Sequence, residues 1–179
     1  MSLRDVDPTT ELRALAHPVR LQILSLLTGV PLTAADVARE LDITHANASY
    51  HLRHLLASGL VEIDGVERIR GGAAKRYRIV PEGIDRPLPP GREPAPVDEE
   101  RLVYAALAAE LRRRAGLARA STRKSLVDAE LWVDPRVWLE VIERITAAAV
   151  DLHHVAQAPR TAGTTRVSMT IAMFQMEES

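Results

Sequence analysis

Between residues 33 and 60, hydrophobic positions recur at helical spacing in two short blocks that a two-residue turn separates. The first block follows Thr33, a residue type that favours helix N-caps, and it places several apolar side chains on one face. Asp42-Ile43 supplies the turn, and Thr44 offers an N-cap to the second block. The pattern predicts two short amphipathic helices joined by a tight turn.

The second of these helices has one apolar face and one polar face. At about 100° per residue, Ala48, Leu52, Leu55 and Gly59 fall within one narrow arc, which a protein core would cover. The side chains that point away from this arc are Ala46, Asn47, Ser49, Tyr50, Arg53 and His54. Two short helices paired in this way are typical of a helix-turn-helix.

The residues before this pair predict its hydrophobic support. Apolar residues from 12 to 16 share one face, His17-Pro18 interrupts them, and residues 19–27 resume as a helix with proline at its first position. Gly29 is expected to end that helix. Periodic apolar residues of this kind are usually core, so we expect the segment to carry the helix-turn-helix.

After Gly59 the hydrophobic spacing changes from helical to alternating, which predicts a two-stranded hairpin over residues 61–79. Its tip, residues 70–75, combines two adjacent glycines with cations on both sides. A hairpin directly after a polar-faced helix is typical of a wing, and wings contact phosphates or the minor groove. The hairpin cations expected to do so are Arg68, Arg70, Lys75 and Arg76. A solvated surface hairpin is the alternative, because charged turns are common.

A connector and a long helix follow the hairpin. Residues 81–97 contain six prolines, a density that excludes a helix or a central strand and predicts a semi-rigid extended linker. A helix is predicted from Asp98, with acids in its first turn and arginines in its last, as the helix dipole favours. Its apolar seam of Val103, Leu107 and Leu111 suits a partner helix.

The last third alternates between two patterns. Residues 125–133 alternate apolar and polar positions, which predicts a strand, and Asp134-Pro135 then starts a helix with a strong N-cap pair. After a loop at residues 159–165, residues 167–177 alternate again and predict a second strand. A strand-helix-strand unit of this size buries little apolar surface alone, so we expect it to pack on the long helix, on a second copy, or on both.

These elements predict an α+β fold in three parts. Residues 1–80 form a mainly helical winged helix-turn-helix domain with a two-stranded wing, residues 81–97 the linker, and residues 98–179 a long helix with a small strand-helix-strand unit. That last part serves dimerisation or binds an effector. Five of its side chains either line a pocket for a small organic effector or enlarge the dimer, and we favour the dimer: Trp132, Trp138, Met169, Met173 and Phe174.

Composition and charge limit the functions that remain. The 179 residues contain no cysteine, no stretch near the roughly 18 apolar residues of a membrane helix, and no signal peptide, so we expect a soluble cytoplasmic protein. The net charge of −1 is unevenly distributed, with a basic excess over residues 52–80 and an acidic excess after residue 125. Because local charge decides which partners a surface attracts, the two halves should face different partners.

Three blocks of the chain resemble the winged helix-turn-helix of the ArsR-type bacterial transcriptional regulators, in order and in spacing. They are LRALAHPVRLQILSLL, LTAADVARELDITHANASYHLRHLLASGLVEI and ERIRGGAAKRYRIV, within residues 12–80. The resemblance implies a cytoplasmic, dimeric regulator that binds an operator. It also implies that the helix after the wing pairs with the first helix of the twin subunit, through Leu12, Leu15, Val103, Leu107 and Leu111.

Reading sequence in the major groove requires a slim helix whose side chains donate to or accept from base edges. On the second helix these are supplied by His45, Asn47, Ser49, Tyr50 and Arg53. By the resemblance, the base-contacting places fall on His45, Ala46, Ser49 and Tyr50, with Thr44 and Arg53 nearer the phosphates. Ala46 departs from a polar norm and offers only a methyl group, which suits thymine.

Metal sensing and catalysis find little support among the residues. Thiolate sites are excluded, and residues 98–115 hold no histidine for an imidazole and carboxylate site on the long helix. His51 with His54, and Asp151 with His154, supply two ligands each, which makes a weak site. No nucleophile elbow, phosphate-cradling loop or zinc-protease motif is present. We therefore expect no metal, no cofactor and no enzymatic activity.

The sequence predicts a transcriptional regulator, interpreted as a repressor, that binds double-stranded DNA as a homodimer at a roughly two-fold symmetric operator. The alternative is a winged helix that serves as a protein-interaction module and docks through the acidic last third. Alanine at Arg70, Lys75 and Arg76 separates the two, since DNA binding should then weaken for all sequences.

Overall fold

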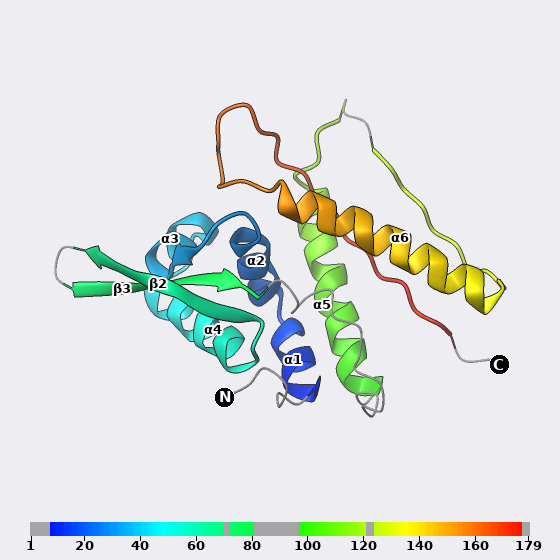
Figure 1. The fold of residues 1–179 in the computed structure, drawn as a ribbon, viewed down its shortest axis with the longest axis horizontal. Coiled ribbons are helices and arrows are strands. Elements are labelled where there is room, and N and C mark those ends of the chain that lie inside the picture. Colours follow the sequence, from blue (N-terminus) through cyan, green and yellow to red (C-terminus); the bar gives the residue numbers. More distant parts are fainter. Residues whose placement is uncertain (1–7, 70–71, 81–96, 121–123, 177–179) are drawn as a thin grey trace.

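The computed structural model describes residues 8–69, 72–80, 97–120 and 124–176. In these residues it contains six helices and one three-stranded antiparallel sheet, which confirms the predicted α+β class (Figure 1). The elements of the first part are α1 (Pro8–Leu15), α2 (Pro18–Leu27), β1 (Leu32–Thr33), α3 (Ala34–Leu41), α4 (His45–Ala57), β2 (Val61–Ile69) and β3 (Gly72–Ile79). Two long helices follow, α5 (Val97–Ala115) and α6 (Pro135–His154).

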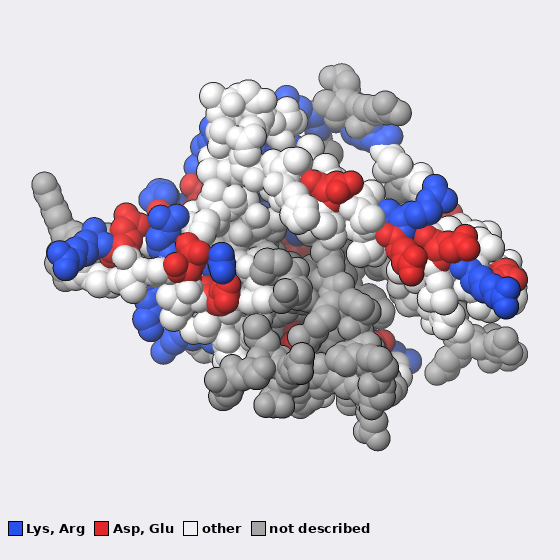
Figure 2. Space-filling view, in the orientation of Figure 1, with Lys and Arg blue, Asp and Glu red and all other residues white. Residues whose placement is uncertain are grey.

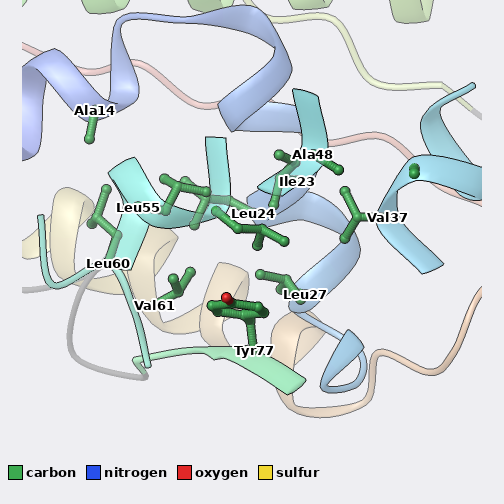
Figure 3. Close-up of a cluster of buried hydrophobic side chains, with 12 residues drawn as sticks. Ala14, Ile23, Leu24, Leu27, Val37, Ala48, Leu55, Leu60, Val61 and Tyr77 are labelled. Carbon is green, nitrogen blue, oxygen red and sulfur yellow. The ribbon is translucent and has the colours of Figure 1, made fainter. Parts of the chain in front are cut away.

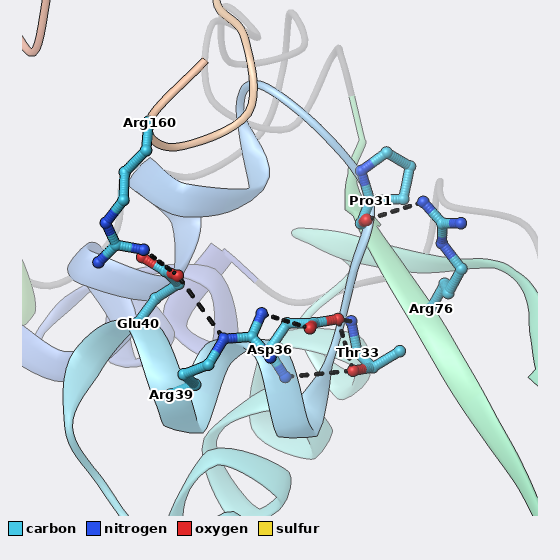
Figure 4. Close-up of polar contacts among 7 residues, drawn as sticks. All are labelled: Pro31, Thr33, Asp36, Arg39, Glu40, Arg76 and Arg160. Atoms are coloured by element: carbon cyan, nitrogen blue, oxygen red, sulfur yellow. Dashed lines mark hydrogen bonds and ion pairs between the residues drawn. The ribbon is translucent and has the colours of Figure 1, made fainter. Parts of the chain in front are cut away.

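Side-chain caps determine where α3 and α4 begin. Thr33 Oγ1 accepts a hydrogen bond from the Asp36 N–H at 3.2 Å, and the Asp36 carboxylate accepts one from the Thr33 N–H at 3.1 Å, a reciprocal capping box (Figure 4). Asp42 ends α3 in the left-handed conformation, with a φ of 55°. Thr44 Oγ1 then accepts from the Asn47 N–H at 3.2 Å and starts α4. The predicted caps and turn are confirmed.

The hydrophobic core lies between α2, α3, α4 and the base of the hairpin. Ile23, Val37, Leu52 and Leu55 are fully buried there, and Tyr77 of β3 closes the cluster from the sheet side (Figure 3). Burial of each such side chain adds about 1.5–3 kcal/mol to the free energy of unfolding, relative to leaving it exposed. The support from α2 and the inward arc of α4 are therefore confirmed, except at Gly59, which lies beyond the end of α4 with a φ of 74°.

Two local features in this part were not predicted. His17 caps α2, because its Nδ1 accepts a hydrogen bond from the Val19 N–H at 3.2 Å. The two residues of β1 pair antiparallel with β3, with Leu32 opposite Tyr77, and add a third strand to the predicted hairpin. The His17 cap therefore determines where α2 begins, and the pairing of β1 with β3 holds the chain that follows α2.

α5 forms as predicted and packs against α1 and α2. At this contact the side chain of Glu110, 1% exposed, accepts hydrogen bonds from Gln22 at 2.6 Å, Arg113 at 2.8 Å and Arg114 at 3.4 Å. Burial raises the pKa of Glu110, but the hydrogen bonds from Arg113 and Gln22 outweigh burial and leave the pKa lowered. Glu110 thus ties α5 to α2 as a carboxylate. Of the predicted linker, residues 81–96 lie outside the described chain, and residue 97 begins α5.

The two strands predicted for the last third are wrong for the single chain. Residues 124–134 and 164–176 run without strand pairing around α6 (Figure 1), and residue 177 lies outside the described chain. A strand needs a neighbouring backbone, and no backbone hydrogen bond joins these two segments to each other or to the sheet in the described parts. The helix predicted between them is confirmed: the Asp134 carboxylate accepts from the Arg136 N–H at 2.8 Å and starts α6.

The loop after α6 returns to the first part of the chain at Gly29. A Cβ on Gly29 would lie 2.5 Å from the backbone oxygen of Gln157, so only glycine allows this approach. Nearby, Arg160 forms an ion pair with Glu40 of α3 at 2.7 Å (Figure 4). The glycine predicted to end α2 therefore has another role, because Thr28 is the C-cap of that helix.

We expect Gly29→Ala to lower the free energy of unfolding by about 1–3 kcal/mol, because a methyl group is forced against backbone that must shift. Urea unfolding measures the loss, and limited proteolysis should show faster cleavage after α6. Gly65→Ala is the matched control, since its Cβ would meet nothing within 4 Å. Equal losses in the two variants would refute the close approach.

Candidate nucleic-acid interface

The outer face of α4 is polar and open. Of the predicted contact residues on α4 and at its N-cap, Ser49 is partly exposed, and the exposed ones are Thr44, His45, Ala46, Asn47, Tyr50 and Arg53. The opposite face is anchored by Ala48, Leu52 and Leu55, which are fully buried. The polar face therefore belongs to a rigidly held helix, and its small residues near the N-terminal end permit close approach to a partner.

Two of these exposed side chains are oriented by their neighbours. The Tyr50 ring, 50% exposed, lies edge-on to His54 with 4.5 Å between centroids. Arg53 Nε donates a hydrogen bond to the Ser49 carbonyl at 3.3 Å. Such contacts restrict the rotamers before any partner binds, which reduces the entropy lost on binding.

His51 lies on the inner side of the same helix, 5% exposed, with its ring 4.7 Å from that of His17. Its Nδ1 is buried and has no hydrogen-bond partner in the described chain. Burial, followed by the charges of His17 and Arg20, lowers the pKa of His51 to about 4. His51 is therefore a neutral packing residue, and its place three residues after the buried Ala48 is the sequence signal that could have indicated this role.

The wing extends the packed face of the sheet outward. Tyr77 is buried on that face at the base of the hairpin, and Lys75, two residues away on the same strand, shares it. Arg68 lies opposite Ala73 and hence on the same face as Lys75. Both cations are exposed, and Figure 2 shows basic side chains at the outer end of the hairpin. The register thus directs two cations to the side on which the helices pack.

The other wing arginines are engaged by the protein itself. Arg76 donates a hydrogen bond to the Pro31 carbonyl at 3.0 Å (Figure 4), and Arg78 pairs with Glu62 at 2.6 Å and with Asp64 at 3.4 Å. Arg76 therefore holds β3 to the loop before β1. Arg70 lies outside the described residues, so its predicted role stays a prediction.

The residues predicted for the dimer interface are distributed differently from the expected seam. Val103 is buried within the chain, where α5 meets α1 and α2, while Leu111 is exposed. Leu12, Leu15 and Leu107 are partly buried. Part of the predicted seam is therefore used inside one chain, and the rest remains open on its surface.

None of the five side chains considered for an effector pocket lines the one cavity that can be described among the described residues. Trp132 is 91% exposed, and Phe174 lies against Tyr104 with 5.1 Å between ring centroids. The cavity, of about 300 Å³, lies instead between the loop after α2, β3 and the end of α6, where Val150 and His153 line it.

Two other kinds of site can be assessed from the same residues. Within the described chain, no three histidine, aspartate or glutamate side chains come together in a group that could hold a metal ion. His54, considered with His51 as a ligand pair, instead faces Tyr50. Likewise, none of the described helices is long and apolar enough to cross a membrane.

Comparison with known proteins places the relationship on this part of the chain. A family described as a helix-turn-helix domain matches residues 15–64, which span α2 to the start of β2. An uncharacterized HTH-type transcriptional regulator of Methanocaldococcus jannaschii is 38% identical over 76 residues, which cover 42% of this chain and 76% of that protein. The exposed polar helix α4 lies within the matched residues, and the chain belongs to the helix-turn-helix type transcriptional regulators.

Proposed function

We propose that this regulator is an ArsR-like repressor that binds a pseudo-palindromic operator as a homodimer. The observation that carries the proposal is the exposed polar face of α4, held by a buried apolar face and flanked by the wing cations Arg68 and Lys75. A slim polar helix on a rigid support is the element that enters a major groove, and a basic hairpin beside it contacts the backbone.

The side chains of α4 divide by reach. His45, Asn47, Ser49 and Tyr50 offer donors and acceptors to base edges, and Ala46 offers a methyl group to thymine. Thr44 and Arg53 lie nearer the phosphates, and at Thr44 the N-terminal end of the helix adds a favourable dipole for anions. Base contacts provide specificity, and phosphate contacts provide register and most of the salt dependence.

A homodimer would place two α4 helices in successive major grooves, about 34 Å apart, so that protein symmetry matches operator symmetry. The interface includes Leu111 and the partly buried leucines of α1 and α5. In this proposal, occupancy of an operator by such a dimer excludes polymerase from the overlapping DNA.

The wing is tested by measuring affinity as a function of salt, on DNA selected from a random pool and on random DNA. Arg68→Ala/Lys75→Ala should weaken binding to both DNAs to the same degree and lower the salt slope by about one per lost phosphate contact. The matched control is Arg136→Ala/Arg144→Ala on the exposed surface of α6. An unchanged slope in the wing variant would refute its role, and no enrichment from the pool would favour the protein-interaction module.

A further inference from the structure

The C-terminal region exposes far more apolar surface than the rest of the chain. Most of the exposed large hydrophobic side chains in the described residues lie between residues 117 and 176. Leu126 and Trp132 are 95% and 91% exposed. Monomeric proteins rarely expose contiguous apolar patches of more than a few hundred Å², and larger ones mark interaction sites. We therefore expect a binding partner to bury this surface.

The backbone of the same region is also unpaired. In the described chain, residues 124–133 and 165–176 make no backbone-to-backbone hydrogen bonds. Both segments alternate apolar and polar side chains, as strands do. An extended segment with free N–H and C=O groups is a template for pairing with another chain. The binding partner should thus supply a strand that pairs with one of these segments.

We propose that residues 167–176 pair antiparallel with the same residues of a second copy, across a two-fold axis. Identical segments that meet at a two-fold axis present the same patch to each other. Residues 167–176 carry no charged side chain and are rich in residues of high β propensity, so every register of self-pairing is free of charge repulsion. A second copy of this chain is consequently the partner that this segment fits.

The other extended segment does not fit a two-fold axis. Antiparallel self-pairing of residues 125–133 about Ala129 sets Asp128 of one copy opposite Glu130 of the other. Like charges directly opposite each other destabilise a strand pair. Residues 125–133 therefore lie away from the axis. There Trp132 can pack on the ribbon, meaning the two paired copies of residues 167–176, or on a helix of the second copy.

One contact within the chain identifies the edge of the segment that is free to pair. Arg114 donates a hydrogen bond to the Met169 carbonyl at 3.4 Å, which engages the edge of the segment that Met169 shares with Ile171. Successive residues of an extended chain turn their amide groups to opposite edges. The free edge hence belongs to Ser168, Thr170 and Ala172. We place the axis beside Thr170, the middle residue of this edge, so that Ser168 lies opposite Ala172 and residues 167–173 of the two copies pair.

The exposed apolar side chains of this region supply part of the area that a stable dimer needs. A standard interface buries about 800 Å² on each partner, and a large aromatic side chain supplies about 150–250 Å². Val167, Ile171 and Phe174 are exposed on the pairing segment, and Trp132 adds to them. The ribbon locates part of the dimer interface that the proposed function requires, and it rests on that function only for the existence of a dimer.

Cysteine substitution tests the register, because the chain has no cysteine and a single introduced one forms disulfides only between copies. Paired Cα atoms of antiparallel strands lie about 4.5–5.5 Å apart, within disulfide range. Thr170→Cys, mildly oxidised at micromolar concentration, should become mostly a covalent dimer on a non-reducing gel. Ser168→Cys and Ala172→Cys should each cross-link at least fivefold less alone, yet form a heterodimer when mixed.

Ser125→Cys is the control for exposure, because it lies in the other extended segment. Circular dichroism confirms that each variant folds. Cross-linking of Thr170→Cys no greater than that of Ser125→Cys would overturn the proposal, as would equal self-cross-linking at residues 168, 170 and 172. The test contains no DNA, so failure of operator binding and failure of the ribbon give separate results.

Discussion

Arg53→Glu should lower the affinity for the selected operator about 100-fold at moderate salt while leaving the fold intact. Arg53 is exposed on the outer face of α4, and its side chain donates a hydrogen bond to the Ser49 carbonyl of its own helix. The reversal removes a cation near the phosphates and adds an anion, and a homodimer carries the change twice. Fluorescence anisotropy with labelled operator measures the loss.

Arg144→Glu makes the same change of charge on the exposed surface of α6 and serves as the control. We expect its affinity to stay within about threefold of the wild type, because a charge beyond the Debye length of about 10 Å is largely screened. Both variants should retain the wild-type melting temperature. Equal losses of affinity would show that net charge governs binding, and the interface assigned to α4 would be wrong.

The elements that sequence predicted correctly are those with local causes. Thr33 caps α3 through Asp36, and Thr44 caps α4 through Asn47, so each cap depends on residues three positions apart. The apolar arc of α4 repeats within one helix and needs only a core to cover it. Residues 33–60 could therefore be placed before any tertiary contact was known.

Contacts between distant segments were not predictable in the same way. Gly29 permits the approach of Gln157, more than a hundred residues later, and no local pattern encodes that meeting. Glu110 is buried because Gln22 satisfies it from another helix, whereas carboxylates alone predict exposure. The two strands predicted for the last third did not form in the single chain because they have no pairing partner there. Alternation of apolar and polar residues describes the faces of a strand and does not identify the neighbouring strand.

Only part of the candidate interface could be predicted, because some of its side chains are oriented by contacts between distant segments. Counting cations along the hairpin treats Lys75 and Arg76 alike, but the register turns Lys75 and Arg76 to opposite faces. Arg76 is then held by the Pro31 carbonyl. On α4, spacing separates the buried from the exposed side chains, while His51 also contacts His17, the N-cap residue of α2.

The burial of His51 predicts a loss of stability on mild acidification. The pKa of its imidazole is lowered from 6.5 to about 4 in the folded protein, by burial first and then by the charges of His17, Arg20 and His54. Folding therefore favours the neutral ring. The contribution of this group to the free energy of unfolding is therefore complete above the unfolded-state pKa. It is lost as the pH falls from about 6.5 toward 4.

Between pH 7 and pH 5 this single group should remove about 2 kcal/mol from the free energy of unfolding, measured by urea titration at fixed protein concentration. His17, whose pKa is also lowered by burial, acts in the same direction. Glu110 and Asp36 have lowered pKa values as well, so their contributions are lost only at more acidic pH. The interval from pH 7 to pH 5 thus isolates the histidines.

His51→Phe keeps a planar ring in the contact with His17 and cannot take up a proton. We expect this variant to lose about 2 kcal/mol less than the wild type between pH 7 and pH 5, which leaves the smaller share of His17. His45→Phe, at the exposed start of the same helix, is the control and should retain the full pH dependence. If His51→Phe lost as much stability as the wild type, burial of a neutral His51 would not be the cause, and the packing assigned to the inner side of α4 would need revision.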